Sequence, residues 1–204
     1  MDGIGFMRYT IALLAIHSLL LSESVLALDK EPAVLRTSED IAHPADAKVL
    51  LSEITAYSNQ IKKDPHNIEA YYYRGRVHLD MRDFGAAAAD FRRSLEFNPY
   101  KQGMSLQLVN KDLKLKEGRE LAAFCYQNLA YMYLLKGQYP TGIGLLSQAI
   151  ALRPAYAINY KNRGLAYKKL GQSELAKKDF ARMNQLVRHP EPDDMGGSSA
   201  AKDF

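Results

Sequence analysis

Residues able to support catalysis or metal binding are few in this sequence, and they stand apart from one another. No pair of its five histidines has the spacing of a metal site, and His78 lies at a position of helical packing. The single cysteine, Cys125, stands between Phe124 and Tyr126 without an evident partner base, which is typical of a packed thiol. The motifs Gly-x-Ser-x-Gly and His-Glu-x-x-His are absent, as are phosphate-binding glycine loops. We therefore expect no enzymatic activity, no metal site and no cofactor.

The composition is typical of one soluble globular domain. Of the 204 residues, 47% are hydrophobic and 25% are charged, and the formal net charge is +4. No dense block of lysine and arginine with interleaved aromatic residues is present, so nucleic acid is not an expected partner. A single cysteine also excludes an intramolecular disulfide framework.

The first 27 residues have the order of a secretory signal peptide. Arg8 supplies a positive start, residues 10–21 are mostly apolar, and Val25 and Ala27 fit the small-residue positions before a cleavage site. This apolar stretch is shorter than the roughly 20 residues that span a membrane, although an uncleaved anchor remains the alternative. We predict cleavage after Ala27 and export of the mature chain, which begins at Leu28, to the periplasm or the medium of a bacterium.

A pattern of 34 residues recurs along the chain. Pro65 and Pro99 stand 34 residues apart, and the ranges 68–101, 123–156 and 157–190 align in one register. The aligned positions carry Tyr71, Gly75, Phe84, Ala87, Phe91 and Pro99 in the first range, Tyr126, Ala130, Tyr133, Gly142, Leu146 and Pro154 in the second, and Tyr160, Gly164, Tyr167, Ala176 and Phe180 in the third. This pattern resembles the tetratricopeptide repeat family. The resemblance implies an all-α fold, a right-handed α-solenoid of helix-turn-helix repeats.

The pattern also predicts how the two helices of a repeat pack. Gly75 and its counterparts let the first helix approach the second, and aromatic side chains fill the layers between them. Arg74 and Arg163 replace a leucine that the family usually carries. The acids Asp90 and Asp179 fall on second helices, whose outer face is usually solvated in this family, so we expect solvated carboxylates there and no acid–base pair.

Four segments lie outside the three repeats and the signal peptide. Residues 28–45 are expected to form a flexible N-terminal segment, and residues 46–64 a capping helix with Asp46 as its N-cap. An insert, residues 102–122, separates the first two repeats, and its charged later part could lengthen the helix that follows. Residues 191–204 contain an acidic pair and a run of glycine and serine, and we expect them to be disordered.

In proteins of this family the first helices of successive repeats line a concave face, which the resemblance implies is the partner-binding surface here. The predicted partner-binding residues are Tyr72, Arg76, Leu79, Phe124, Gln127, Tyr131, Leu135, Lys161, Leu165 and Lys168. The middle repeat contributes apolar and aromatic side chains, whereas the last repeat is rich in lysine. We therefore expect a protein or peptide ligand with an apolar anchor and an acidic end.

The expected function is that of a non-enzymatic scaffold or adaptor in the bacterial cell envelope. Two alternatives stay open, a self-associating structural or assembly protein and an accessory subunit of an envelope enzyme or secretion complex. The insert or the capping helix could also cover the apolar groups of the concave face. In that case the lysines of the last repeat would serve only to keep the protein soluble.

Overall fold

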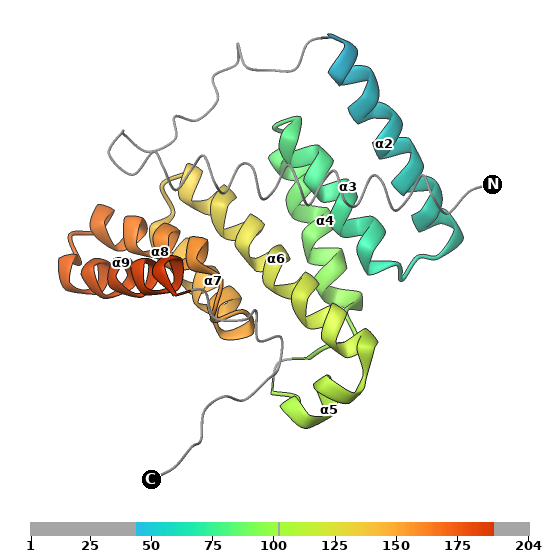
Figure 1. Cartoon of the computed structure of the whole chain (residues 1–204). Helices are drawn as coiled ribbons and strands as arrows, with labels where there is room; N and C mark the ends of the chain where they lie inside the picture. The colour runs from blue at the N-terminus through green and yellow to red at the C-terminus, as the bar shows by residue number, and fades with distance from the viewer. Residues whose placement is uncertain (1–43, 102, 190–204) are drawn as a thin grey trace. The chain divides into compact units, whose positions relative to one another are not determined.

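The computed structural model (Figure 1) describes residues 44–101 and 103–189, which form α-helices and contain no strand. The predicted signal peptide, residues 28–43 of the predicted N-terminal segment and the predicted tail 191–204 lie outside these residues. The helices are α2 (Pro44–Lys63), α3 (Ile68–Asp80), α4 (Phe84–Phe97), α5 (Leu106–Lys111), α6 (Leu113–Leu135), α7 (Tyr139–Leu152), α8 (Ala157–Lys169) and α9 (Ser173–Arg188).

Local side-chain caps determine where several of these helices begin. The Asn67 side chain accepts a hydrogen bond from a backbone N–H in the first turn of α3, at 2.9 Å. Asp83 caps α4 in the same way at 3.0 Å, and Asp112 caps α6 at 2.9 Å. Each of these side chains satisfies a backbone donor that the helix itself leaves without a partner.

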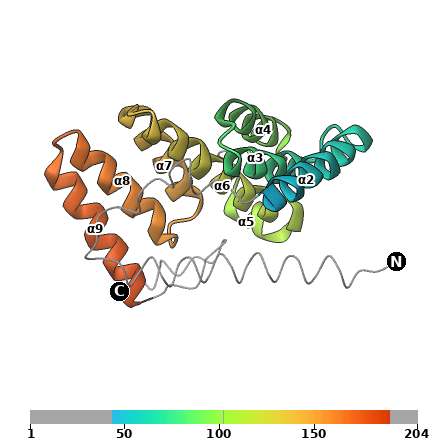
Figure 2. The ribbon, with the colours of Figure 1, turned by 90° about the horizontal axis from the view of Figure 1, so that it is seen from above.

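The helices form three pairs that pack one against the next. α3 packs on α4, α6 on α7 and α8 on α9, while α4 contacts α6, α7 contacts α8, and α2 packs on α3. Figure 2 shows that α4 and α7 lie on the side of α3 and α6 that faces away from the viewer of Figure 1. The described part of the chain is therefore a solenoid of helical pairs, with α3, α6 and α8 as first helices and α4, α7 and α9 as second helices.

Two glycines bring the helices of a pair into close contact. A Cβ atom on Gly75 would lie 3.0 Å from Cε1 of Phe91, and a Cβ atom on Gly164 would lie 2.9 Å from Cε1 of Phe180. The Phe91 ring is fully buried. Only a residue without a side chain leaves room for an aromatic ring of the second helix at this distance, so the small and aromatic positions of the pattern act together.

The capping helix differs from the sequence-based prediction in its start. α2 begins at Pro44, which suits the first turn of a helix because proline has no N–H group to leave without a partner. Asp46 therefore lies inside the first turn of α2, and its prediction as the N-cap is wrong. The helix ends at Lys63, close to the predicted end.

α2 packs on α3 as the second helix of a preceding repeat would, but its side chains differ from those of a second helix. In repeat register, its residues Glu53, Tyr57 and Gln60 correspond to Gly142, Leu146 and Ala149 of α7, which are buried. The residues of α2 are larger and mostly polar; Glu53 and Tyr57 are only partly buried, and Gln60 is exposed. α2 is thus suited to end the stack, because the side on which α7 packs against a first helix is polar in α2.

The insert contains the short helix α5 and extends α6 at its N-terminal end. α6 begins at Leu113, ten residues before the predicted start of the second repeat, and α5 packs against it. The buried Asn98 side chain donates a hydrogen bond to the Gly118 carbonyl at 2.8 Å. A Cβ atom at residue 118 would lie 2.6 Å from Asn98 Oδ1, so the glycine in the middle of α6 is required for this contact.

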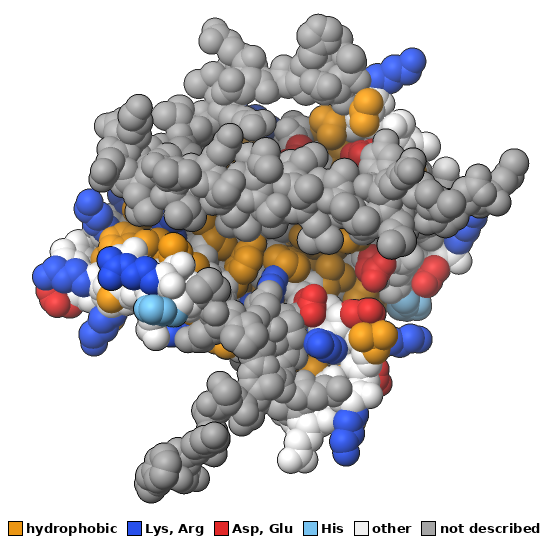
Figure 3. Space-filling model, viewed as in Figure 1, with side chains coloured by type: hydrophobic (Ala, Val, Ile, Leu, Met, Phe, Trp, Pro, Cys, Tyr) orange, Lys and Arg blue, Asp and Glu red, His pale blue; other side chains and the backbone are white. Residues whose placement is uncertain are grey.

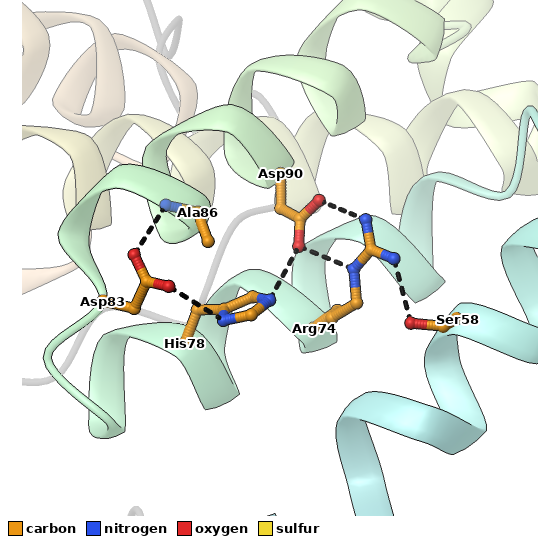
Figure 4. A network of polar contacts seen from close by, with 6 residues as sticks. All are labelled: Ser58, Arg74, His78, Asp83, Ala86 and Asp90. Atoms are coloured by element: carbon orange, nitrogen blue, oxygen red, sulfur yellow. Dashed lines mark hydrogen bonds and ion pairs between the residues drawn. The ribbon is translucent and has the colours of Figure 1, made fainter. Parts of the chain in front are cut away.

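An ion pair joins the helices of the first repeat and ties them to α2 (Figure 4). Arg74 Nε and Nη2 donate to the two carboxylate oxygens of Asp90 at 2.8 and 2.7 Å, and Nη1 donates to Ser58 Oγ at 3.0 Å. Hydrogen bonding to Asp90 raises the pKa of Arg74. Figure 4 also shows His78 between two carboxylates, 3.8 Å from Asp83 and 3.9 Å from Asp90.

The last repeat contains the same three residue types in the same arrangement. Arg163 donates to both oxygens of Asp179 at 2.8 Å and to Ser147 Oγ of α7 at 3.0 Å, and the aspartate again stands 16 positions after the arginine. Asp90 and Asp179 are only 4% and 5% exposed. The prediction that these two carboxylates are solvated is therefore wrong. The middle repeat has Leu129 and Leu145 at the positions of the pair.

We predict that Asp179→Ala lowers the free energy of unfolding by about 3 kcal/mol, because it leaves the Arg163 guanidinium without its partner in a largely buried position. The double variant Arg163→Leu/Asp179→Leu, which copies the middle repeat, is expected to stay within about 1 kcal/mol of the wild type. Urea unfolding followed by circular dichroism measures both values. Equal losses in the single and the double variant would contradict this interpretation.

Candidate binding surface

The outer side chains of α3, α6 and α8 form a surface that we call the first-helix surface. We define it by the ten predicted partner-binding residues together with Glu69, Tyr73, Asp80, Arg153, Tyr156 and Lys169. The predicted residues recur at common repeat positions, so they face the same way on successive helices: Tyr72, Gln127 and Lys161 share one position, and Arg76, Tyr131 and Leu165 share another.

Aromatic rings run without a break across this surface. Tyr57 of α2 stacks on Tyr73 of α3, with ring centroids 5.7 Å apart and an interplanar angle of 19°. Tyr73 contacts Tyr72 at 5.1 Å, and Tyr72 contacts Phe124 of α6 at 6.2 Å. Phe124 in turn meets Tyr156, in the turn before α8, edge to face at 5.9 Å. The rings therefore connect α2, the first repeat and the second repeat as far as the residue that precedes α8.

Arg153 lies against two of these rings. Its guanidinium carbon is 4.6 Å from the ring centroids of both Phe124 and Tyr156, within the range of cation–π attraction. Burial lowers the pKa of Arg153, against the opposing influence of Tyr156 and Glu120. The side chain is 8% exposed and supports the surface from within.

Sequence reasoning missed Arg153 and Tyr156, although a signal was present. Tyr156 occupies the position at which Asn67 caps α3, and no side chain caps α8 there. Arg153 precedes Pro154 where the first repeat has Asn98 before Pro99. A capping position filled by an aromatic residue, next to an unusual arginine, indicates that these side chains have a task other than capping.

Arg76 is half-buried among tyrosines of three elements. Tyr72, Tyr57, Tyr73 and Tyr156 all lie close enough to interact with its charge. Burial lowers the pKa of Arg76, but Tyr72 and the Asp80 carboxylate outweigh burial, so the pKa is raised overall. Arg76 is thus a fixed cation, held in place by phenol groups.

The predicted residues differ in how much of each side chain a partner could contact. Tyr131 and Leu165 are 42% and 37% exposed, and Lys168 is exposed. The half-buried residues are Arg76, Leu79, Phe124, Gln127, Leu135 and Lys161. Figure 3 shows hydrophobic side chains gathered over the middle of this face, where α6 runs in Figure 1.

Tyr72 departs from the prediction of a partner contact. It is only 5% exposed, because its ring packs between Phe91 and Phe124 at centroid distances of 6.0 and 6.2 Å. It therefore shapes the surface from below and offers little of its ring to a partner. Gln127 stands at the same repeat position on α6, and its side-chain oxygen is buried without a hydrogen-bond partner among the described residues.

The other side of α6 holds a cavity of about 170 Å³. It is smaller than the roughly 300 Å³ at which pockets for small molecules begin. Its lining includes Leu95, Asn98, Tyr100, Tyr126, Gln148 and Leu152. Within residues 44–101 and 103–189, no three histidine, cysteine or acidic residues gather closely enough to hold a metal ion. None of the helices in these ranges has both the length and the apolar character needed to cross a membrane.

Comparison with known proteins identifies the class of repeat. Residues 68–101 and residues 159–183 match models of the tetratricopeptide repeat. These two segments therefore match the tetratricopeptide repeat, and the helical pairs of the described residues agree with a solenoid of such repeats.

Solved structures with similar folds come from MamA and YrrB. A structure of MamA MSR-1 is 17% identical, with a TM-score of 0.48 and coverage of 72% of either chain. MamA from Desulfovibrio magneticus RS-1 is 18% identical, with a TM-score of 0.36, over 70% of this chain and 88% of that one. YrrB, a TPR protein with an unusual peptide-binding site, is 15% identical, with a TM-score of 0.32, over 72% of this chain and 81% of that one. Each of these structures superposes on this chain only in part, so the assignment of tetratricopeptide repeats rests on the two sequence matches.

We predict that Cys125 does not react in the folded protein. It is fully buried next to Ser94, and burial raises the pKa of its thiol to about 12, so almost no thiolate forms at pH 8. Iodoacetamide should label the chain in urea and leave it unlabelled in buffer, as mass spectrometry can measure. Full labelling of the native protein, with its circular dichroism unchanged, would contradict this prediction.

Proposed function

We propose that this protein is a scaffold that binds a segment of another protein on its first-helix surface. The observation that carries the proposal is the connected row of aromatic rings, together with the exposed Tyr131 and Leu165 on α6 and α8. On α6 the predicted contact positions carry no charge at all. Rigid aromatic and aliphatic side chains at the centre of a surface, with arginine beside them, are the groups that dominate binding energy in protein interfaces.

The second helices offer less for a partner to bind. Their interior positions are occupied by the contacts between repeats, such as the fully buried Phe91 and Leu146. Their exposed positions include charged pairs one turn apart, Arg93 with Glu96 and Glu174 with Lys177, which are typical of a solvated face. The first helices are therefore the better candidate for the interface.

We also propose that the protein acts outside the inner membrane, in the bacterial cell envelope. The support for this location is the sequence alone: a positive start, an apolar stretch and small residues before the cut after Ala27. An adaptor with this address would hold proteins of the envelope together.

The binding surface is tested by recovery of partners from envelope extract. Tyr131→Ala should reduce recovery by about tenfold or more, because it removes an exposed ring from the centre of the surface. The double variant Lys161→Glu/Lys168→Glu should do the same for a partner with an acidic end. Quantitative mass spectrometry of the recovered proteins gives the ratio to wild type.

Two control variants match these changes elsewhere on the chain. Lys177→Glu/Lys178→Glu makes the same charge change on the exposed face of α9, and Leu113→Ala shortens an exposed side chain of the insert region. Both should keep full recovery. If Leu113→Ala loses the partner while Tyr131→Ala keeps it, the interface lies on the insert and the proposal is wrong. Dimers seen by light scattering without a partner would favour self-association.

Export is tested by expression of the full chain in a bacterium and N-terminal sequencing of the envelope fraction. We expect the sequence to begin at Leu28, because cleavage after Ala27 leaves that residue first. Protein that begins at Met1 or Met7 would show that the segment is retained. Protein found only in the cytoplasm would refute the proposed location.

A further inference from the structure

Charge is divided unevenly between the two ends of the first-helix surface. At the first repeat, the exposed Glu69 and Asp80 lie on α3, and Glu53 lies on the neighbouring α2. Burial raises the pKa of Glu53, and the negative charge of Asp80 raises it further. Arg76 lies among them, and Arg74 is engaged with Asp90. Acidic groups therefore prevail at this end.

The opposite end is basic. Lys161, Lys168 and Lys169 line α8, and α8 contains no aspartate or glutamate. Among the described residues, no carboxylate forms an ion pair with any of these lysines. The only acidic group that α8 contacts through a salt bridge in the described ranges is Asp179, and its partner is Arg163. The three lysines are thus available to an outside anion.

Between the two ends, the outer positions of α6 carry no charged side chain. The outer positions of α6 carry Phe124, Gln127, Tyr131 and Leu135. Phe124 and Leu135 are half-buried and Tyr131 is exposed, so this part can receive apolar side chains of a ligand. The order along the surface is acidic over α2 and α3, aromatic over α6, and basic over α8.

We propose that the ligand is a protein segment with the complementary order: a basic end over α3, apolar or aromatic residues over α6, and an acidic end over α8. The inference rests on the proposed function and adds the polarity of the ligand to it. Lysine or arginine at the basic end would meet Glu69 and Asp80, beside the stacked rings of Tyr57 and Tyr73. Charge order of this kind determines register and direction more than affinity.

The test is a selection of random twelve-residue peptides displayed on phage, performed on the mature protein, residues 28–204. We expect enriched peptides to have basic residues at one end, apolar residues in the middle and acidic residues at the other end, in one chain direction. The matched variant Glu69→Lys/Asp80→Lys/Lys161→Glu/Lys168→Glu should enrich the reverse order. Fluorescence anisotropy of one synthetic peptide of each order should show at least a tenfold difference in Kd, of opposite sign for the two proteins.

The outcomes separate the two proposals. Peptides with an apolar middle but no charge order would overturn this inference and leave the proposed function standing. If no peptides are enriched, or if Tyr131→Ala leaves their enrichment unchanged, both this inference and the proposed function are overturned. Two other occupants of the surface would also overturn this inference. If deletion of residues 190–204 raises peptide affinity tenfold, the surface binds the chain's own tail. If the protein forms dimers that peptides dissociate, the surface binds a second copy.

Discussion

The close approach of two helices within each repeat determines what the rest of the chain can do. Gly75 and Gly164 leave room for the rings of Phe91 and Phe180, which would lie only 3.0 and 2.9 Å from a Cβ atom at these two positions. Because the second helix fills this contact completely, the first helix keeps its opposite side for other purposes. The row of aromatic rings from Tyr57 to Tyr156 crosses the first helices, and its member Tyr72 also packs against Phe91 of the second helix.

The outer repeats add a polar constraint that the middle repeat lacks. Arg74 and Arg163 each bind an aspartate of the following helix and a serine of the preceding one, so three helices are joined at each end of the stack. Leucines replace this arrangement in the middle repeat. A buried ion pair adds little stability over well-packed apolar residues, but its directional hydrogen bonds favour one alignment of the helices.

Much of this fold could be predicted from the sequence, since the small and aromatic positions recur with a fixed period. The ion pairs were missed because periodicity predicts which residues lie on a helix, not which charged groups meet across two helices. Arg153 and Tyr156 were missed for a similar reason: their contacts with Phe124 depend on the path of the turn before α8. The burial of Tyr72 depends on the neighbouring repeat, which a position within one repeat cannot reveal.

The central claim is that a partner binds the first helices and leaves the second helices in contact with solvent. Hydrogen exchange of the mature protein, with and without a partner recovered from envelope extract, tests this claim most directly. We expect slower exchange of backbone amides in α3, α6 and α8, and no change in the solvent-facing turns of α4 and α9. Protection confined to α4, α7 and α9, or to α5 in the insert, would contradict the account.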